Sequence, residues 1–193
     1  MDIILASASP RRRELLEMLG VQNMTVMPAQ GEEASCEGMS PSDAVLALSR
    51  AKAEEVAQRC GEAGRSGIII AADTVVASER NILGKPRSEA HAAEMLRSLS
   101  GRTHKVYTGV TIIAGDRMLA AAEETAVTFR SMTEREIAAY IATGEPMDKA
   151  GAYGIQGIAS LFVEKIDGDF FNVMGLPLCR LAQLLSEVGV NLI

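Results

Sequence analysis

Short apolar runs alternate with segments of helical periodicity along most of the chain. Apolar runs predict strands at 3–6, 24–28, 67–77, 106–114, 118–129 and 160–166, and the run at 67–77 is too apolar for a solvated face. Apolar positions recur with the helical period at 10–19, 41–58, 88–99, 133–142 and 176–188, which predicts helices. Alternating strands and helices, with a hairpin turn at Gly115-Asp116, predict a mixed α/β sheet.

Capping residues mark the ends of several predicted helices. Ser9 and Pro10 suit the N-cap and the first position of the helix at 10–19, and Gly20 suits its end. Thr133 and Glu136 have the spacing of a capping box, which predicts that a helix begins there.

Composition excludes several classes of protein. The chain has 193 residues, of which 48% are hydrophobic and 23% charged, as in a globular protein. Its net charge of −6 argues against general nucleic-acid binding but leaves room for a small anionic substrate in a local basic pocket. Cys36, Cys60 and Cys179 are widely spaced, which predicts no disulfide framework or zinc site and fits a reducing cytoplasm. No apolar run approaches about 18 residues, so no membrane span is expected.

Three arginines, Arg11, Arg12 and Arg13, fall in the first turn of the first predicted helix. Cations at that end oppose the helix dipole, which favours negative charge there by about 0.3–1 kcal/mol per charge. An anionic ligand held by backbone N–H groups and guanidinium groups would resolve the conflict. The alternative is that the arginines simply extend into solvent.

Carboxylates supply the second candidate feature. Asp73 lies within the apolar run at 67–77, where a carboxylate is unfavourable unless it is paired or holds a metal. The alternative is an aspartate at a strand end that bonds to local backbone. Glu32 and Glu33 follow another short strand and on their own are expected to be solvated. The two histidines lack metal-ligand spacing and are expected to be structural.

Further cations and a polar loop complete the candidate set. Lys85 lies between Gly84 and Pro86, which constrain the backbone, whereas Lys52 on the helix at 41–58 has a surface ion pair as its alternative. Gln156 lies in a glycine-punctuated loop, and its amide can donate to and accept from the edge of a base. Carboxylates, cations and this loop together predict metal-assisted attack of water on a phosphate.

The motifs occur in an order that resembles the Maf family of nucleoside triphosphate pyrophosphatases. They are Leu5-Ala-Ser-Ala-Ser-Pro-Arg-Arg, Ala72-Asp-Thr-Val-Val, Gly84-Lys-Pro, Ser100-Gly-Arg-Thr-His, Asp148-Lys-Ala-Gly-Ala-Tyr-Gly-Ile-Gln-Gly and Gly175-Leu-Pro. The resemblance covers nearly the whole chain. It implies an α/β fold like that of Maf and inosine triphosphate pyrophosphatases, with an elongated, twisted mixed sheet flanked by helices and two lobes around a central cleft. Since no linker separates the lobes, residues 1–193 are expected to form a single domain.

The resemblance also implies roles for individual residues. Asp73 would be a metal ligand and the general base, and Glu33 would share the metal. The segment Gln30-Gly-Glu-Glu-Ala departs from the Asp-Glu pair of many members, so Glu32 is the alternative ligand. The remaining residues would bind the substrate. Those that would hold or line the triphosphate are Ser7, Ser9, Arg12, Arg13, Lys52 and Lys85, and the two lysines would also be catalytic. Those that would set base specificity are Arg12, Thr74 and Gln156.

The activity implied is hydrolysis of dTTP, UTP and modified pyrimidine nucleotides such as 5-methyl-UTP and pseudo-UTP to the monophosphate and pyrophosphate. This would be a house-cleaning role in the cytoplasm that uses Mg²⁺, or else Mn²⁺ or Co²⁺, and the enzyme would form a homodimer. The alternative is a nucleotide-binding regulator of cell division and septum formation with weak or incidental hydrolysis. The carboxylates favour the enzyme, because a site that only binds a polyanion has little use for them without a metal.

Overall fold

The computed structural model describes residues 2–21, 23–31, 36–78 and 82–192. Over these residues the chain forms a mixed seven-stranded sheet of order β2-β1-β3-β5-β6-β7, with β4 paired to β3. The strands are β1 (Ile3–Leu5), β2 (Met24–Val26), β3 (Ile68–Ala77), β4 (Ile82–Leu83), β5 (Thr103–Ala114), β6 (Arg117–Phe129) and β7 (Val163–Asp167). β1 runs parallel to β2 and β3, whereas β4 and β7 run antiparallel to their neighbours. The predicted mixed α/β class is confirmed.

Helices flank this sheet. The α-helices are α1 (Pro10–Met18), α2 (Pro41–Glu62), α3 (Glu89–Leu99), α4 (Glu134–Ile141), α5 (Phe170–Met174) and α6 (Leu178–Glu187). Three 3₁₀ segments are η1 (Glu145–Asp148), η2 (Ala150–Ala152) and η3 (Ile158–Phe162). The chain divides into two compact units. The first comprises Met1–Asp73, Thr108–Glu123 and Gly175–Ile193, and the second comprises Thr74–Tyr107 and Glu124–Met174.

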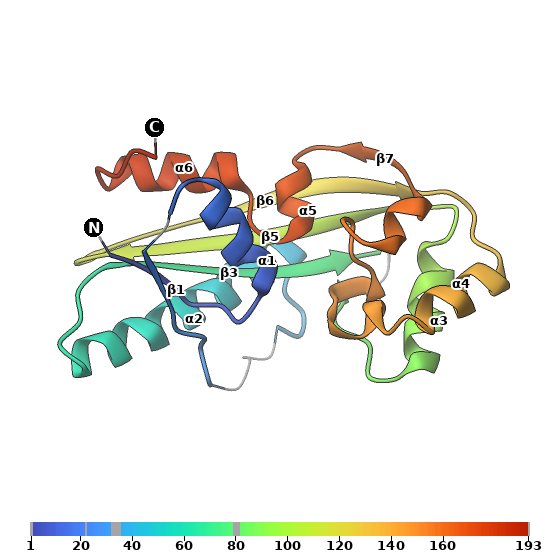
Figure 1. The fold of residues 1–193 in the computed structure, drawn as a ribbon, viewed down its shortest axis with the longest axis horizontal. Helices are drawn as coiled ribbons and strands as arrows, with labels where there is room; N and C mark the ends of the chain where they lie inside the picture. The colour runs from blue at the N-terminus through green and yellow to red at the C-terminus, as the bar shows by residue number, and fades with distance from the viewer. Residues whose placement is uncertain (1, 22, 32–35, 79–81, 193) are drawn as a thin grey trace. The chain divides into compact units, whose positions relative to one another are not determined.

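In the first unit, α2 packs on one face of the sheet and α6 lies on the opposite side (Figure 1). The α2 interface buries Ile69 and Ala71 of β3 with Ala53, Val56 and Cys60 of the helix. Ile69 and Ala71 are two residues apart and so lie on one face of the strand, and Ala53, Val56 and Cys60 are three and four residues apart and so lie on one face of the helix. These two apolar faces pack together to form this part of the core. A buried hydrogen bond between Ser49 Oγ and Thr111 Oγ1, 2.8 Å apart, joins α2 to β5.

In the second unit, α3 packs against α4, η1 and η2. The predicted capping box is present, with Thr133 Oγ1 accepting from the Glu136 amide and the Glu136 carboxylate accepting from the Thr133 amide. Three rings, His104, Phe129 and Tyr153, meet edge to face with centroids 4.8–5.4 Å apart. These contacts fix β5, β6 and the segment after η2 to one another.

The structure differs from the predicted elements in several places: β2 ends at Val26, β5 begins at Thr103, and β4 was not predicted. The helix predicted at 41–58 continues to Glu62. The first three residues of the strand predicted at 160–166 belong to η3, and the strand begins at Val163. α5 has no counterpart among the predicted helices. Across the described part of the chain, no helix combines the length and the apolar character needed to cross a membrane, and all three cysteines carry free thiols.

Candidate functional site

Asp73 is a buried carboxylate of β3, 8% exposed, and it forms an ion pair with Lys52 of α2. The alternation of a strand places Asp73 on the face of β3 that carries Ile69 and Ala71. That face packs on α2, so the fold brings the carboxylate and the ammonium together across 21 residues of sequence. Lys52 thus pairs with the predicted general base.

Charge balance explains why this carboxylate tolerates burial. The side chains of Lys52 and Asp73 are 21% and 12% exposed, so both ions are largely removed from water. An isolated buried carboxylate is strongly unfavourable, and removing one partner of a buried pair leaves the other charge uncompensated. The pair is therefore an electrostatic unit whose members depend on each other.

The Asp73 carboxylate also fits a divalent cation of the Mg²⁺ class. Such hard cations are commonly held by one or two carboxylates together with phosphate oxygens of the substrate. Among the residues that the structure describes, no group of three or more His, Cys, Asp or Glu residues could hold a metal by itself. The predicted second ligand Glu33 and its alternative Glu32 both lie outside the described residues.

Among the three arginines at the start of α1, Arg12 forms hydrogen bonds to distant parts of the chain. Its Nη1 donates to the Ala72 carbonyl at 2.7 Å and to Ser7 Oγ at 3.0 Å, and its Nε donates to the Gly175 carbonyl at 2.8 Å. These bonds tie the start of α1 to the residue that immediately precedes Asp73. Charge-assisted bonds of this kind are about twice as strong as neutral ones, so the guanidinium fixes this part of the first unit.

Ser9 and Arg13, which were also predicted to hold or line the triphosphate, make fewer side-chain contacts than Arg12. Ser9 occupies the N-cap position of α1 without a side-chain capping bond, and its amide donates to Ser7 Oγ at 3.2 Å. Arg13 pairs with Glu17 on the exposed side of α1, at 2.7 Å. The first turn of α1 carries no acidic residue, which leaves the mismatch with the helix dipole in place.

The second unit contains the predicted residues Thr74, Lys85 and Gln156. Thr74 shares a face of β3 with Val76, and a Cβ added to Gly151 in η2 would lie 2.9 Å from Val76 Cγ2. The Gly151 amide also donates to the Gly84 carbonyl, at 3.0 Å, directly before the exposed Lys85. The Thr74 face of β3, the Lys85 segment and η2 are therefore packed together, and Gln156 is exposed four residues beyond η2.

Two features of the second unit escaped the sequence patterns. His104 Nε2 and Tyr153 Oη are hydrogen-bonded at 2.8 Å. Burial lowers the pKa of His104 to about 4 and raises that of Tyr153, so the pair is uncharged near neutral pH. Glu145 of η1 bonds to residues on both sides of it in the chain, Tyr140 and Ile158. The only local signal for Glu145 was its place beside the glycine-rich loop.

Comparisons with known proteins agree with the resemblance. Residues 2–188 match a family model described as Maf-like protein. Relatives named dTTP/UTP pyrophosphatase, from Bacillus cereus, Bacillus thuringiensis subsp. konkukian and Bacillus anthracis, are each 50% identical over 98% of this chain and 96% of their own length. A crystal structure of a nucleoside-triphosphatase / dITP/XTP pyrophosphatase from Mycobacterium abscessus matches 75% of this chain and 95% of that chain. Its TM-score of 0.46 and identity of 16% make this likeness too remote to carry an argument. By the family model and by relatives that match nearly its whole length, this chain belongs to the Maf family.

Proposed function

We propose that the protein hydrolyses nucleoside triphosphates, with dTTP and UTP as substrates, to the monophosphate and pyrophosphate. The names of the relatives that match nearly its whole length support this activity. The observation that carries the chemistry is the buried Asp73–Lys52 pair, which lies directly after the carbonyl that Arg12 binds. A carboxylate, an ammonium and a guanidinium fixed in one unit suit a polyanionic substrate attacked by water.

In this mechanism Asp73 accepts a proton from the attacking water. The water oxygen bonds to the α-phosphorus, the bond from that phosphorus to the oxygen bridging to the β-phosphate breaks, and pyrophosphate leaves with the electron pair. Lys52 holds the Asp73 carboxylate in place, and Lys85 neutralises phosphate charge. Asp73 would hold a divalent cation, Mg²⁺ or else Mn²⁺ or Co²⁺, which would supply charge neutralisation to the phosphate and lower the pKa of a bound water.

Base preference is assigned to Thr74 and Gln156, together with Arg12. The amide of Gln156 presents one acceptor and two donors, which suits the edge of a pyrimidine that both donates and accepts. 5-Methyl-UTP and pseudo-UTP keep a pyrimidine edge of this kind, so we include them among the substrates. Hydrolysis of such modified nucleotides would give the protein a house-cleaning role.

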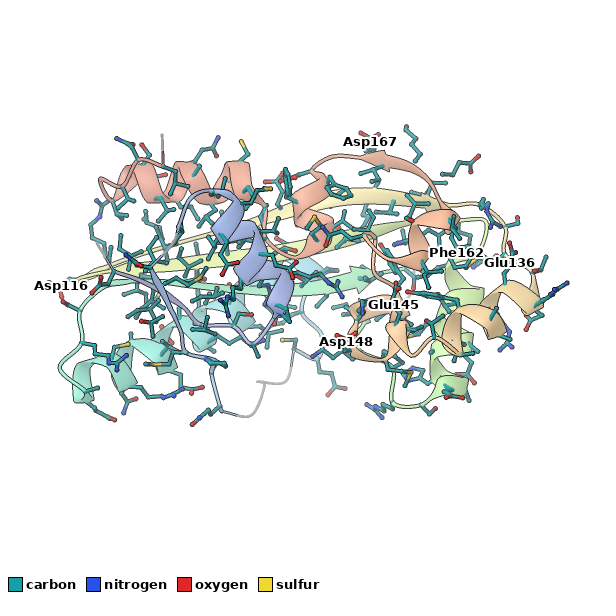
Figure 2. All side chains as sticks on the ribbon, in the orientation of Figure 1. Asp116, Glu136, Glu145, Asp148, Phe162 and Asp167 are labelled. Carbon is teal, nitrogen blue, oxygen red and sulfur yellow. The ribbon has the colours of Figure 1, made fainter. Side chains whose placement is uncertain are left out.

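The test is pyrophosphate release from canonical and modified nucleoside triphosphates with Mg²⁺, Mn²⁺, Co²⁺ or EDTA. Asp73→Asn should lower kcat by roughly 10²–10⁴-fold, the usual contribution of a general base. The matched control is Asp116→Asn, which alters an exposed aspartate in the β5–β6 turn of the same unit (Figure 2). Near-normal turnover by a folded Asp73→Asn variant would refute the assigned role. Nucleotide binding without turnover by the wild type would favour the regulator instead.

We further propose that the protein acts in the cytoplasm as a homodimer. Free thiols on all three cysteines are typical of a reducing compartment. The family resemblance supports the dimer. Light scattering coupled to size-exclusion chromatography measures the mass in solution, and a monomer at micromolar concentration would contradict the proposal.

A further inference from the structure

Gln156 is carried by a tight turn of the second unit. The Gly157 amide donates to the Gly154 carbonyl at 3.0 Å, so Ile155 and Gln156 occupy the two central positions of a β-turn. The Ile155 side chain is buried and that of Gln156 is exposed. This alternation anchors the turn on one side and presents the amide of Gln156 on the other.

Both ends of this turn are bonded to one pair of side chains, Tyr140 and Glu145. Glu145 Oε1 accepts from Tyr140 Oη at 2.9 Å, and its Oε2 accepts from the Ile158 amide at 3.0 Å. The Gly154 amide donates to Tyr140 Oη at 3.3 Å. Backbone N–H groups before and after Gln156 are thus held by the same tyrosine–carboxylate pair, in the part of the second unit where Figure 2 labels Glu145.

The two glycines of the turn allow Glu145 and Lys149 to approach its backbone closely. A Cβ at Gly157 would lie 2.2 Å from Glu145 Oε1, and a Cβ at Gly154 would lie 2.7 Å from Lys149 Cε. Lys149 in turn donates from Nζ to the Glu145 carbonyl at 2.6 Å. A side chain at either position would displace the end of Glu145 or Lys149, because the backbone itself lies against the Glu145 carboxylate and the Lys149 stem.

The residues beneath this turn are buried and well packed. Tyr140 is 2% exposed, and its ring packs edge to face on Phe162 with centroids 5.6 Å apart. On the other flank, Tyr153 directly precedes the turn and is held by its hydrogen bond to His104. The turn has little freedom as long as Glu145 holds its far end at Ile158.

We propose that Glu145, with Tyr140, is a positioning residue that sets base preference by holding the turn that carries Gln156. The inference rests on the proposed function, in which Gln156 reads the base. A hydrogen bond weakens steeply as its angle and distance depart from the optimum, so an amide on a loose turn discriminates poorly between bases. Glu145 therefore acts through Gln156 and not on the reacting atoms.

The experiment compares Glu145→Ala, Glu145→Gln and Tyr140→Phe with the wild type. For each we measure kcat and KM with UTP and GTP, and amide hydrogen exchange at Ile158. Glu145→Ala should raise the KM for UTP and lower the ratio of kcat/KM for UTP over GTP by about tenfold, the effect of one lost hydrogen bond. kcat for UTP should stay within about threefold, and exchange at Ile158 should accelerate. Glu145→Gln keeps one acceptor oxygen and should fall between Glu145→Ala and the wild type.

A double variant separates positioning from general destabilisation. If Glu145 acts through Gln156, adding Glu145→Ala to Gln156→Ala should change the UTP/GTP ratio no further. The controls are Glu164→Ala, at an exposed position of β7, and Tyr107→Phe, a half-buried tyrosine of β5, and both should keep the wild-type ratio. If circular dichroism shows Glu145→Ala to be unfolded, Glu145→Gln and Tyr140→Phe carry the same comparison.

The outcomes are distinct. A wild-type ratio in folded variants with faster exchange at Ile158 would overturn the inference alone, because the turn would be loose without effect on preference. Additive effects in the double variant would overturn it as well. If the wild type turns over no nucleotide, the proposed hydrolysis fails, and the same ratios are then measured as Kd values by calorimetry. Loss of the UTP preference in those Kd values would support the positioning role, and an unchanged preference or no nucleotide binding would overturn it.

Discussion

A close approach of α2 to β5 in the first unit makes Gly109 a sharp test of the packing. Gly109 is buried in β5 opposite α2. A Cβ there would lie 2.3 Å from the Val45 carbonyl oxygen and 2.5 Å from its carbonyl carbon, about 1 Å short of ordinary contact at 3.4 Å. These are backbone atoms in the first half of α2, so no side-chain rotation relieves the clash. The helix has to move away from the sheet.

We expect Gly109→Ala to lower the free energy of unfolding by about 3 kcal/mol or more. Overpacking of a core usually costs about 1–3 kcal/mol, and a clash with a helix backbone belongs at the upper end of that range. Withdrawal of α2 would also stretch the buried bond between Ser49 and Thr111 and open the apolar contacts around Ala53. Since Lys52 lies on the same helix, kcat should fall as well.

Urea unfolding followed by far-ultraviolet circular dichroism measures the change. The matched control is Gly61→Ala near the end of α2, where a Cβ would meet nothing within 4 Å. There the same substitution should stabilise the protein by about 0.5–1 kcal/mol, because alanine favours helix more than glycine does. A free energy of unfolding for Gly109→Ala within about 0.5 kcal/mol of the wild type would refute the reasoning, since a free energy change that small is typical of an unconstrained position.

Three further predictions concern pH, the arginine turn and η2. The free energy of unfolding should fall by about 3 kcal/mol between pH 6.5 and pH 4. In this range His104 binds a proton in the unfolded chain, whereas in the folded protein burial lowers its pKa to about 4 and keeps the ring neutral. Equal pH slopes for the wild type and His104→Phe in urea titrations would contradict this. Arg12→Lys should lower the free energy of unfolding by about 1–3 kcal/mol, because two main-chain carbonyls lose their donors. Arg13→Lys should change it by less than about 0.5 kcal/mol. Equal melting temperatures for the two variants would contradict the structural role of Arg12. Gly151→Ala should lower the free energy of unfolding by about 1–3 kcal/mol, since a φ of +67° is strained for alanine and the added Cβ would clash with Val76. An unchanged melting temperature would contradict this and show that the backbone of η2 shifts to relieve the clash.

Elements with strong local signals could be predicted from the sequence. The capping box at Thr133 and Glu136 defines the start of α4 by two bonds between residues three apart. Ser40 caps α2 with one such bond, accepting from the Asp43 amide. The apolar run at 67–77 is long and almost without polar residues, which is typical of a buried strand, and it forms β3. In each case the deciding interactions lie within a few residues of one another.

Elements decided by distant contacts were predicted less well. Residues 160–162 form part of a 3₁₀ turn, in which Phe162 packs on Tyr140 and lies 5.2 Å from the Arg130 guanidinium. Those partners are 22 and 32 residues earlier in the chain, and the apolar pattern alone does not distinguish this turn from a strand. α5 was missed because five residues are too short to show a helical period. In the structure its start is held by a bond from the Phe171 amide to Asp169 Oδ1, at 2.7 Å.

For the candidate site, the sequence by itself determined which groups can do the chemistry, and the tertiary structure decided which of them meet. An unusual residue in an apolar run singled out Asp73, but its partner Lys52 had an equally reasonable local alternative until α2 packed on β3. Arg12 stood out by opposing the helix dipole, yet one of its acceptors, Gly175, is 163 residues away. No sequence pattern singled out Glu145, and only the folded structure shows that its carboxylate accepts hydrogen bonds from Tyr140 and from the Ile158 amide. The physical reason is that periodicity and capping act over a few residues, whereas charge pairing and close packing depend on which surfaces the topology brings together.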